Sequence, residues 1–565
     1  MEEENKIYPH VYEKMEDWPI NKLHRDRKAF VQEIIDFTVE RLLRKKTEDV
    51  TDMIGKTAYL EQIRIKEEPW KIDPPNERSF WKKIQKRLVK TALDQKPAQA
   101  KAANKELLTA IVSSYAEEIV ATFRIKTFQF ARKFLTWFFG RLLNTAASRN
   151  IKRIFSRKHQ LSERMKISGE IEKVRSLMKK GTVIILPTHH SNLDSVLIGY
   201  IMDTFGGLPH FSFAAGLNLY NTGYTAYFIN RVGAYRLDRR KKNPVYLETL
   251  KAMSNLAIQR GTNCIIFPGG TRSRSGHLEK KLKMGMMGTA VEAQRALAAK
   301  GKEEKVFIVP VVVGYHFVLE APFLIESHLR QTGKERYINV KDGSYSFRKV
   351  LKFAWNYFSN GSEILLTFGK PLDVLGNFVD AEGASSDQYG NPIDIKDYFK
   401  KDGVVNKDLQ RDRQYTQILA DRVVERFFAD NVVLSSHVIA FLMFNILKAQ
   451  NTHLDLYGLL RLPTEDFEFP MEMVVQAMEA LQTELKVLEA ANKAKLSKEI
   501  HWDAKELIEE GLQFLGVFHA QAPLKINKAG NVISESFKLL YFYHNRLDHY
   551  DLDKKINWSV YKINA

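Results

Sequence analysis

A histidine and an aspartate five residues apart, His189 and Asp194, are the pair in this chain best suited to proton transfer. They lie in the polar stretch 187–194, directly after the apolar run 183–186. An apolar run that breaks at a proline predicts a buried strand ending in a loop, and α/β sheets place their reactive groups at such strand ends. A carboxylate makes a histidine a general base, because it fixes the tautomer and stabilises the imidazolium.

No serine or cysteine nucleophile motif accompanies this pair, so the base would deprotonate a hydroxyl of the substrate. A simpler interpretation is that His189 is an ordinary loop histidine and that Asp194 caps the following helix. The spacing alone favours the simpler interpretation, and three later segments favour the catalytic one.

The first two of these segments are rich in arginine and glycine. Residues 233–240 contain Arg239 behind a glycine-led strand end, and residues 267–276 follow another apolar run. Arginine offers a planar donor fork that matches phosphate, and glycines let backbone N–H groups converge on an anion. The GxxxxGK[ST] spacing of a Walker A loop is absent. The residues suited to phosphate contacts are Arg239, Gly270, Thr271, Arg272, Ser273 and Arg274. The simpler interpretations are a solvated basic turn at 233–240, which this segment alone would favour, and a surface turn at 267–276, which its paired arginines make the weaker choice.

The last segment, 309–315, is an apolar run that contains Pro310 and ends in Gly314 and Tyr315. It predicts a central strand whose end, with its small and aromatic residues, is suited to line an apolar groove. Alone, it would be an ordinary core strand.

These segments need a sheet to position them. Strand-like runs (183–186, 264–267 and 306–313) alternate with helix-like runs (243–259 and 284–299). This alternation predicts an α/β fold with a largely parallel sheet flanked by helices, and with helical N-terminal and C-terminal regions.

Bulk properties narrow the class of protein. The 565 residues carry a net charge of +19, which favours an anionic partner. No nucleic-acid motif is present, so we expect a membrane surface or a phosphorylated substrate instead. The single cysteine, Cys264, excludes an intrachain disulfide and metal sites built from several cysteines, and we expect it in the core of a cytosolic protein. We find no signal peptide and no run of about 20 apolar residues that could span a bilayer.

Residues 123–158 have a different character. A wide helical stripe of apolar residues, including Phe134 and Phe138, precedes a cluster of six basic residues. This pattern suits a helix that lies on anionic lipid, and it suits a core-facing helix with a solvated basic end equally well. The basic residues are Arg141, Arg149, Lys152, Arg153, Arg157 and Lys158.

Taken in order, the four segments resemble the motifs of the glycerolipid acyltransferase superfamily: an H-x4-D block, a Gly- and Arg-containing block, an FPEGTRS-like block and a VPV-like block. Residues 315–320 and 540–545 look like further segments of the glycerol-3-phosphate and dihydroxyacetone-phosphate acyltransferase branch. The resemblance covers roughly 123–550. It departs from the pattern at Gly269, where the family usually has Glu.

The resemblance implies acyl transfer from acyl-CoA or acyl carrier protein to the sn-1 hydroxyl of glycerol 3-phosphate, with His189 as base and Asp194 as its orienting partner. It implies no metal, no cofactor and a peripheral place on the cytoplasmic face of the membrane. The alternatives are acylation of lysophosphatidate and a catalytically silent lipid-binding protein. We expect an N-terminal helical region (1–120), a membrane-associating segment (121–165), an α/β acyltransferase domain (166–379), a loop (380–407) and a mainly helical C-terminal region (408–565).

Overall fold

The computed structural model describes residues 6–93, 97–146, 161–162, 164–220, 223–333, 363–516 and 519–561. Its centre is a seven-stranded sheet in the order β1-β7-β6-β2-β5-β3-β4. The strands are β1 (Met165–Gly169), β2 (Gly181–Pro187), β3 (Ser212–Gly216), β4 (Ala234–Leu237), β5 (Cys264–Ile265), β6 (Lys305–Tyr315) and β7 (Ile364–Phe368).

The sheet is largely parallel, as the alternation of apolar runs predicts. β6, β2, β5, β3 and β4 run parallel to one another, so their carboxyl ends meet at one edge of the sheet. β7 is antiparallel to β6, and β1 is parallel to β7. The prediction of an α/β fold with a largely parallel sheet is therefore confirmed.

Both faces of the sheet are covered, which explains why β2 is apolar along its whole length. Val183 and Ile185 pack into one hydrophobic cluster with α8 (Ile171–Leu177) and α9 (Asp194–Thr204). Ile184 and Leu186 point to the other face, against α12 (Met284–Ala299) and α15 (Leu409–Asp430). α11 (Pro244–Gln259) and α12 begin and end within a residue of the two helices predicted from the sequence.

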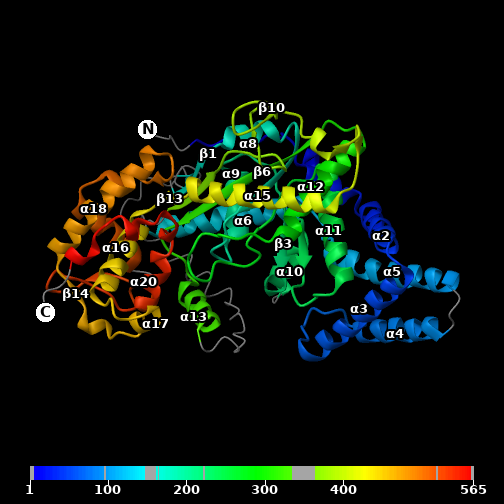
Figure 1. Ribbon diagram of the computed structural model, residues 1–565, viewed down its shortest axis with the longest axis horizontal. Coiled ribbons are helices and arrows are strands. Elements are labelled where there is room, and N and C mark those ends of the chain that lie inside the picture. Colours follow the sequence, from blue (N-terminus) through cyan, green and yellow to red (C-terminus); the bar gives the residue numbers. More distant parts are fainter. Residues whose placement is uncertain are drawn as a thin grey trace.

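Helices from the two ends of the chain lie on opposite sides of the sheet (Figure 1). On the N-terminal side, α2 to α5 pack with α11 around a second hydrophobic cluster. The N-terminal helices are α1 (Pro19–Arg25), α2 (Arg27–Leu43), α3 (Thr47–Glu67), α4 (Glu77–Leu93) and α5 (Pro97–Ile119). α6 (Ile125–Ala146), α10 (Gly223–Ile229) and α13 (Ala321–Thr332) complete the surroundings of the sheet.

On the C-terminal side, α16 (Ser435–Gln450) is buried along most of its length between its neighbours. Its apolar residues within 438–447 are all buried and form part of the hydrophobic core. Around it lie α17 (Leu456–Leu459), α18 (Met471–Ala490), α19 (Ala504–Gly516) and α20 (Phe537–His544). Two-residue strands occur in and next to the predicted loop: β8 (Phe378–Val379), β9 (Ser385–Ser386), β10 (Pro392–Ile393), β11 (Lys400–Lys401) and β12 (Val404–Val405). Others occur between the C-terminal helices: β13 (Val432–Val433), β14 (Glu468–Phe469), β15 (Lys495–Leu496), β16 (Lys525–Ile526) and β17 (Val532–Ile533).

A buried network of charges joins the N-terminal helices to the connection between β4 and α11. Arg240 pairs with Asp73 at 2.6 Å and with Asp238 at 2.7 Å. Lys241, which is buried, pairs with Glu118 at 2.5 Å. Because a buried charge is costly without a partner, these pairs tie α5 and the loop after α3 to the sheet.

The glycine-rich loop after β5 is in turn joined to the C-terminal helices. Gly276 has φ +87°, and a Cβ atom on it would collide with the carbonyl oxygen of Phe542 in α20. Asn545 donates a hydrogen bond from Nδ2 to the carbonyl of Ser275 at 2.8 Å. The loop therefore takes its shape from α20 as well as from the strand before it.

We predict that Gly276→Ala lowers the thermal unfolding midpoint well beyond Gly530→Ala. Gly530 has nearly the same φ, +86°, but a Cβ atom on it would meet no atom within 4 Å. Alanine at 530 therefore adds only the left-handed strain of about 1–2 kcal/mol, whereas alanine at 276 adds a backbone clash. Differential scanning calorimetry of both variants makes the comparison, and equal losses would show that α20 does not constrain the loop.

Candidate active site

The carboxylate of Asp194 accepts four hydrogen bonds at the end of β2. Its Oδ2 accepts from Nδ1 of His189 at 2.7 Å and from the backbone N–H groups of His190 and Ser191 at 2.7 and 3.0 Å. Its Oδ1 accepts from the hydroxyl of Tyr315 at 2.6 Å. Asp194 is fully buried and is the first residue of α9, where Leu193 occupies the N-cap position. The capping interpretation of Asp194 is therefore wrong.

His189 is held at its ring, its carbonyl and its amide. The ring packs at a tilt against Phe267 with 4.3 Å between centroids, and the His189 carbonyl accepts from the amide of Ser273 at 2.8 Å. Its own amide donates to Oε1 of Glu279 at 3.0 Å. Because a carboxylate only accepts hydrogen bonds, Nδ1 is the donor toward Asp194, and the lone pair of the neutral ring lies on Nε2. This arrangement can take a proton from a bound hydroxyl.

Glu320 joins the histidine loop to the glycine-rich loop. Its carboxylate accepts from the Ser191 hydroxyl at 3.0 Å and from the Asn192 amide at 2.9 Å. Nη1 of Arg272 lies 3.5 Å from the same carboxylate. Burial raises the pKa of Glu320, and the Asn192 amide and the Arg272 charge oppose that rise. The structure thus brings Arg272 beside the loop of His189.

The glycine-rich loop offers fewer backbone donors than its sequence suggests. Gly270 has φ +76°, which favours glycine, but its amide donates to the carbonyl of Phe267 at 3.1 Å. The amide of Ser273 is bound to His189, and its hydroxyl donates to the carbonyl of His277 at 2.7 Å. Two of the backbone donors expected to bind an anion, the amides of Gly270 and Ser273, are therefore bound inside the protein.

The remaining predicted residues lie further from His189. The charge of Arg274 helps to lower the pKa of His328 in α13, after burial and His277. Arg239 is exposed in the turn after β4, three strands from β2, which is about 14 Å along the sheet. Pro310 is buried in β6, opposite Leu186, and its carbonyl accepts from the amide of Gly369 at 2.8 Å. The place of Pro310 in a groove stays a prediction.

A buried cation lies beneath the site. Nη2 of Arg546 donates to the carbonyl of Val313 at 2.9 Å, and Nη1 contacts Nε2 of His190. Burial lowers the pKa of Arg546 to about 10, while the charges of Glu279 and Asp194 oppose this shift. Burial and the charge of Arg546 hold the pKa of His190 well below its usual range. Nε2 of His190 is therefore occupied by Arg546.

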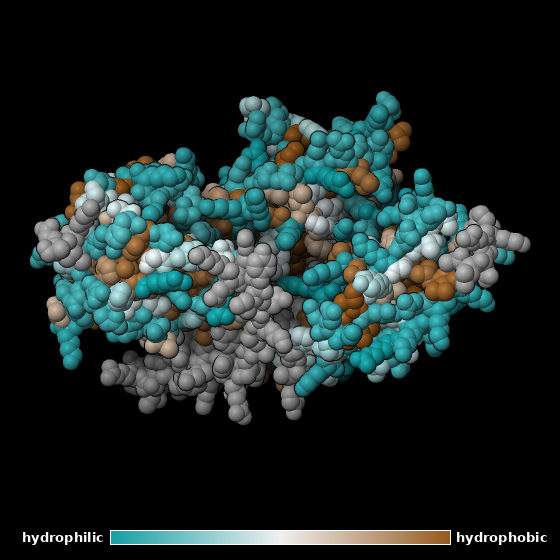
Figure 2. Space-filling view, turned by 60° about the horizontal axis from the view of Figure 1, so that its bottom comes forward, coloured by the Kyte–Doolittle hydropathy of each residue, from teal (hydrophilic) through white to brown (hydrophobic). Residues whose placement is uncertain are grey.

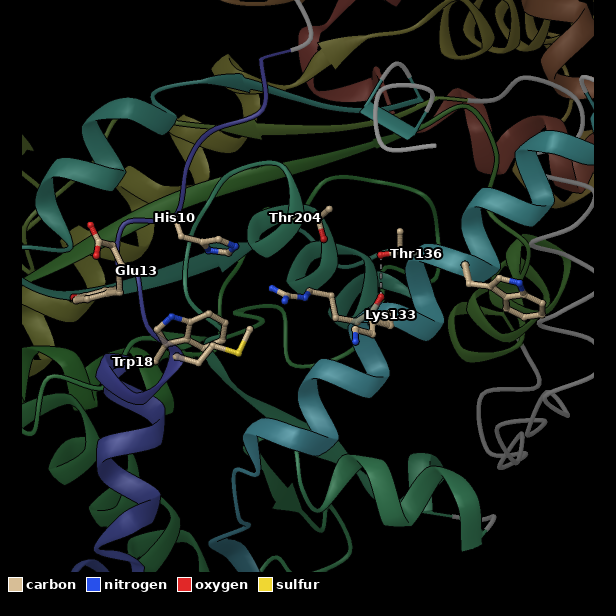
Figure 3. Close-up of a pocket in the computed structure, with 10 residues that line it drawn as sticks. His10, Glu13, Trp18, Lys133, Thr136 and Thr204 are labelled. Carbon is tan, nitrogen blue, oxygen red and sulfur yellow. Dashed lines mark hydrogen bonds between the residues drawn. The ribbon is translucent and has the colours of Figure 1, made fainter. Parts of the chain in front are cut away.

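A cavity away from His189 lies at the N-terminal side of the sheet. It measures about 580 Å³ and opens between the N-terminal segment, α6 and the end of α9. His10 and Trp18 line it from one side, and Lys133 and Thr136 from the other (Figure 3). A second cavity, of only about 20 Å³, lies among His190, His437 and Arg546.

Sequence reasoning missed several residues of the candidate site. Tyr315 and Glu320 lie in the segment 315–320, which resembles a motif of the family, so this resemblance could have pointed to them. Arg546 follows the last recognised segment directly and belongs to no motif. Glu279 also belongs to no motif, and only its hydrogen bond to the His189 amide reveals it.

Comparison with known proteins agrees with the geometry. Residues 137–314 match the family described as Acyltransferase. Glycerol-3-phosphate acyltransferase of Aeromonas hydrophila is 26% identical over 308 residues, which are 54% of this chain and 33% of that protein. The proteins of the same name from Alteromonas mediterranea and Pseudoalteromonas atlantica are 27% and 28% identical over 48% and 50% of this chain, and over 30% and 31% of their own lengths.

The matched part of the chain thus spans about a third of the length of these curated relatives. It includes the H-x4-D pair, the strand that precedes it and the glycine-rich loop bound to it. The chain therefore contains, at residues 137–314, a segment that matches the Acyltransferase family and includes the His189–Asp194 pair.

Proposed function

We propose that this protein transfers a fatty acyl chain from an acyl thioester, acyl-CoA or acyl carrier protein, to the sn-1 hydroxyl of glycerol 3-phosphate in phospholipid synthesis. The observation that carries the proposal is the His189–Asp194 pair, with a 2.7 Å hydrogen bond, bound through the His189 carbonyl to an arginine-containing loop. The pair supplies a base, and the loop supplies charge for the acceptor phosphate.

In this reaction, Nε2 of His189 takes the hydroxyl proton as the hydroxyl oxygen attacks the thioester carbonyl carbon. The C–S bond of the tetrahedral intermediate then breaks, and the leaving thiolate takes the proton from the imidazolium. Asp194 stabilises the imidazolium and cannot swing away, because Tyr315 and two backbone amides hold it. No covalent acyl-enzyme, metal or cofactor is required.

Arg272 is the best-placed cation for the acceptor phosphate, since it lies against Glu320 beside the histidine loop. Arg239 and Arg274 are further candidates. Because β4 lies about 14 Å from β2 along the sheet, Arg239 is equally suited to bind a phosphate of the acyl donor, which is larger than the acceptor. Lysophosphatidate offers the same phosphate and hydroxyl chemistry, so it remains the second candidate acceptor.

A peripheral place on the cytoplasmic face of an anionic membrane is part of the proposal. No described helix is long and apolar enough to cross a bilayer. One side of α6 packs inward through Phe128 and Phe139, while Phe130, Phe134 and Trp137 are 59%, 39% and 54% exposed. The inward side of the helix supports the core-facing interpretation, and its exposed aromatic side chains support the proposal of a membrane contact. The basic residues of 149–158 lie outside the described part of the chain.

Hydrophobic patches interrupt a mostly hydrophilic surface on the face drawn in Figure 2. On α6, the exposed aromatic side chains lie beside the exposed Lys133, and Phe130 stacks on Phe228 of α10 at 5.6 Å. Aromatic rings next to cations suit the headgroup region of an anionic bilayer.

We predict that His189→Ala lowers kcat about 10²- to 10⁴-fold, the usual contribution of a general base, while the melting temperature stays within a few degrees. Asp194→Asn is also severe, because the histidine loses its orienting carboxylate. Thiol release from acyl-CoA in the presence of glycerol 3-phosphate measures both. More than half of the activity remaining in His189→Ala would exclude the mechanism.

For the phosphate contacts, we expect Arg272→Ala to raise the KM for glycerol 3-phosphate at least 10-fold while the KM for acyl-CoA changes little. Arg272→Lys recovers part of the loss, because it keeps the charge but lacks the fork. Arg260→Ala, whose guanidinium pairs with Asp26 and Glu33, is the matched control. If Arg272→Ala or Arg239→Ala raises the donor KM instead, that residue binds the thioester's phosphates.

For the membrane, we expect the triple variant Phe130→Ser, Phe134→Ser and Trp137→Ser to bind anionic vesicles less, with unchanged turnover of a soluble acceptor. The control, Tyr389→Ser with Val404→Ser, removes exposed apolar side chains of 81% and 69% exposure from another region. Binding should weaken with salt, because charge attraction is screened. Equal sedimentation of the triple variant and the parent with anionic and neutral vesicles would contradict a membrane role for α6.

A further inference from the structure

Gly269 and Glu279 share one small space beside the candidate base. A Cβ atom on Gly269 would lie 3.0 Å from Cγ of Glu279 and 3.2 Å from its Oε1. A side chain at residue 269 would therefore press on Glu279 and require it to shift by a few tenths of an ångström. Gly269 is also the position at which the chain departs from the Glu usual in the family.

The carboxylate of Glu279 is committed to the histidine loop. Oε1 accepts from the amide of His189 at 3.0 Å, while Oε2 is buried and makes no hydrogen bond to the described residues. Burial raises the pKa of Glu279, and the amide of His189 is the strongest opposing influence, ahead of the charges of His189 and Arg546. The described contacts of this side chain thus converge on His189 and the cation beneath it.

His189 needs such a contact. It lies after the last residue of β2 and before α9, outside both elements, so no sheet or helix hydrogen bond fixes its backbone. Asp194 fixes the ring and Ser273 fixes the carbonyl. Glu279 supplies the contact to the amide, and loss of this acceptor would leave a donor unsatisfied beside the reacting atoms.

We propose that Glu279 is a positioning residue for His189, and that the absence of a side chain at Gly269 makes room for it. On this proposal, which rests on the proposed function, a carboxylate from position 279 fills the space that a Glu at position 269 would otherwise use. Glu279 acts through the histidine and touches neither the acyl donor nor the acceptor.

The kinetic test is an exchange of the carboxylate between the two positions. We expect Glu279→Ala to lower kcat about 10- to 100-fold with little change in either KM, because a small misplacement of the base slows chemistry more than binding. Glu279→Gln keeps the acceptor oxygen and most of the kcat. Gly269→Glu alone is impaired by the clash with Glu279. The double variant, Gly269→Glu with Glu279→Ala, is more active than Gly269→Glu.

Lys280→Ala is the matched control, because Lys280 is the exposed neighbour of Glu279 and pairs with Asp548 on the surface. It should leave kcat unchanged. A kcat for Glu279→Ala within twofold of the parent, or a double variant no better than Gly269→Glu, overturns the proposal. Melting temperatures of all variants separate misfolding from misplacement of the base.

A second measurement does not depend on turnover. Hydrogen exchange of peptides covering 187–192 should show one faster amide in Glu279→Ala and none in Glu279→Gln, because the His189 amide loses its acceptor only in the first. An unchanged exchange rate in Glu279→Ala overturns the proposal. If the parent protein transfers no acyl chain to any acceptor, the proposed function fails, and the exchange result still decides whether Glu279 holds His189.

Discussion

The carboxylate of Asp194 is the constraint on which the site depends. Four donors converge on it from the histidine ring, two backbone amides and the strand β6. A buried carboxylate is stable only with such a set of partners, since its desolvation is costly. The same hydrogen bonds that make the charge tolerable also fix the loop between β2 and α9. The partners that make burial of the Asp194 carboxylate possible therefore also hold His189 in position.

From this carboxylate the order extends outward in steps. The carbonyl of His189 binds the amide of Ser273 and so positions the glycine-rich loop. Glu320 connects Arg272 of that loop to the amide of Asn192. α20 closes the arrangement, because Asn545 binds the carbonyl of Ser275 and Arg546 binds that of Val313. The C-terminal helices thus support the site from below. The acyltransferase match ends at residue 314, well before them.

The sequence predicted the sheet and its large helices because their signals are local. The apolar runs of β2 and β6 and the periodicity of α11 and α12 are visible within a dozen residues. The H-x4-D pair could also be found, because its two residues are only five positions apart in the sequence. Glu279 and Arg546 could not be found, because their contacts with His189 and His190 join distant segments. The free donors of the glycine-rich loop were overestimated, since the sequence does not show that the amides of Gly270 and Ser273 are bound inside the protein.

The charge network at the other side of the sheet has a consequence for how this chain can be divided. Arg240 and Lys241 belong to the turn after β4, yet their counter-charges Asp73 and Glu118 come from the first 120 residues. A shorter chain beginning at α6 would keep the two cations and lose both carboxylates. It would also uncover the face of α11 that packs on α2 and α5. The N-terminal helices are therefore packed as part of the α/β unit. We expect the smallest fragment that folds on its own to include them as well as the recognisable motifs.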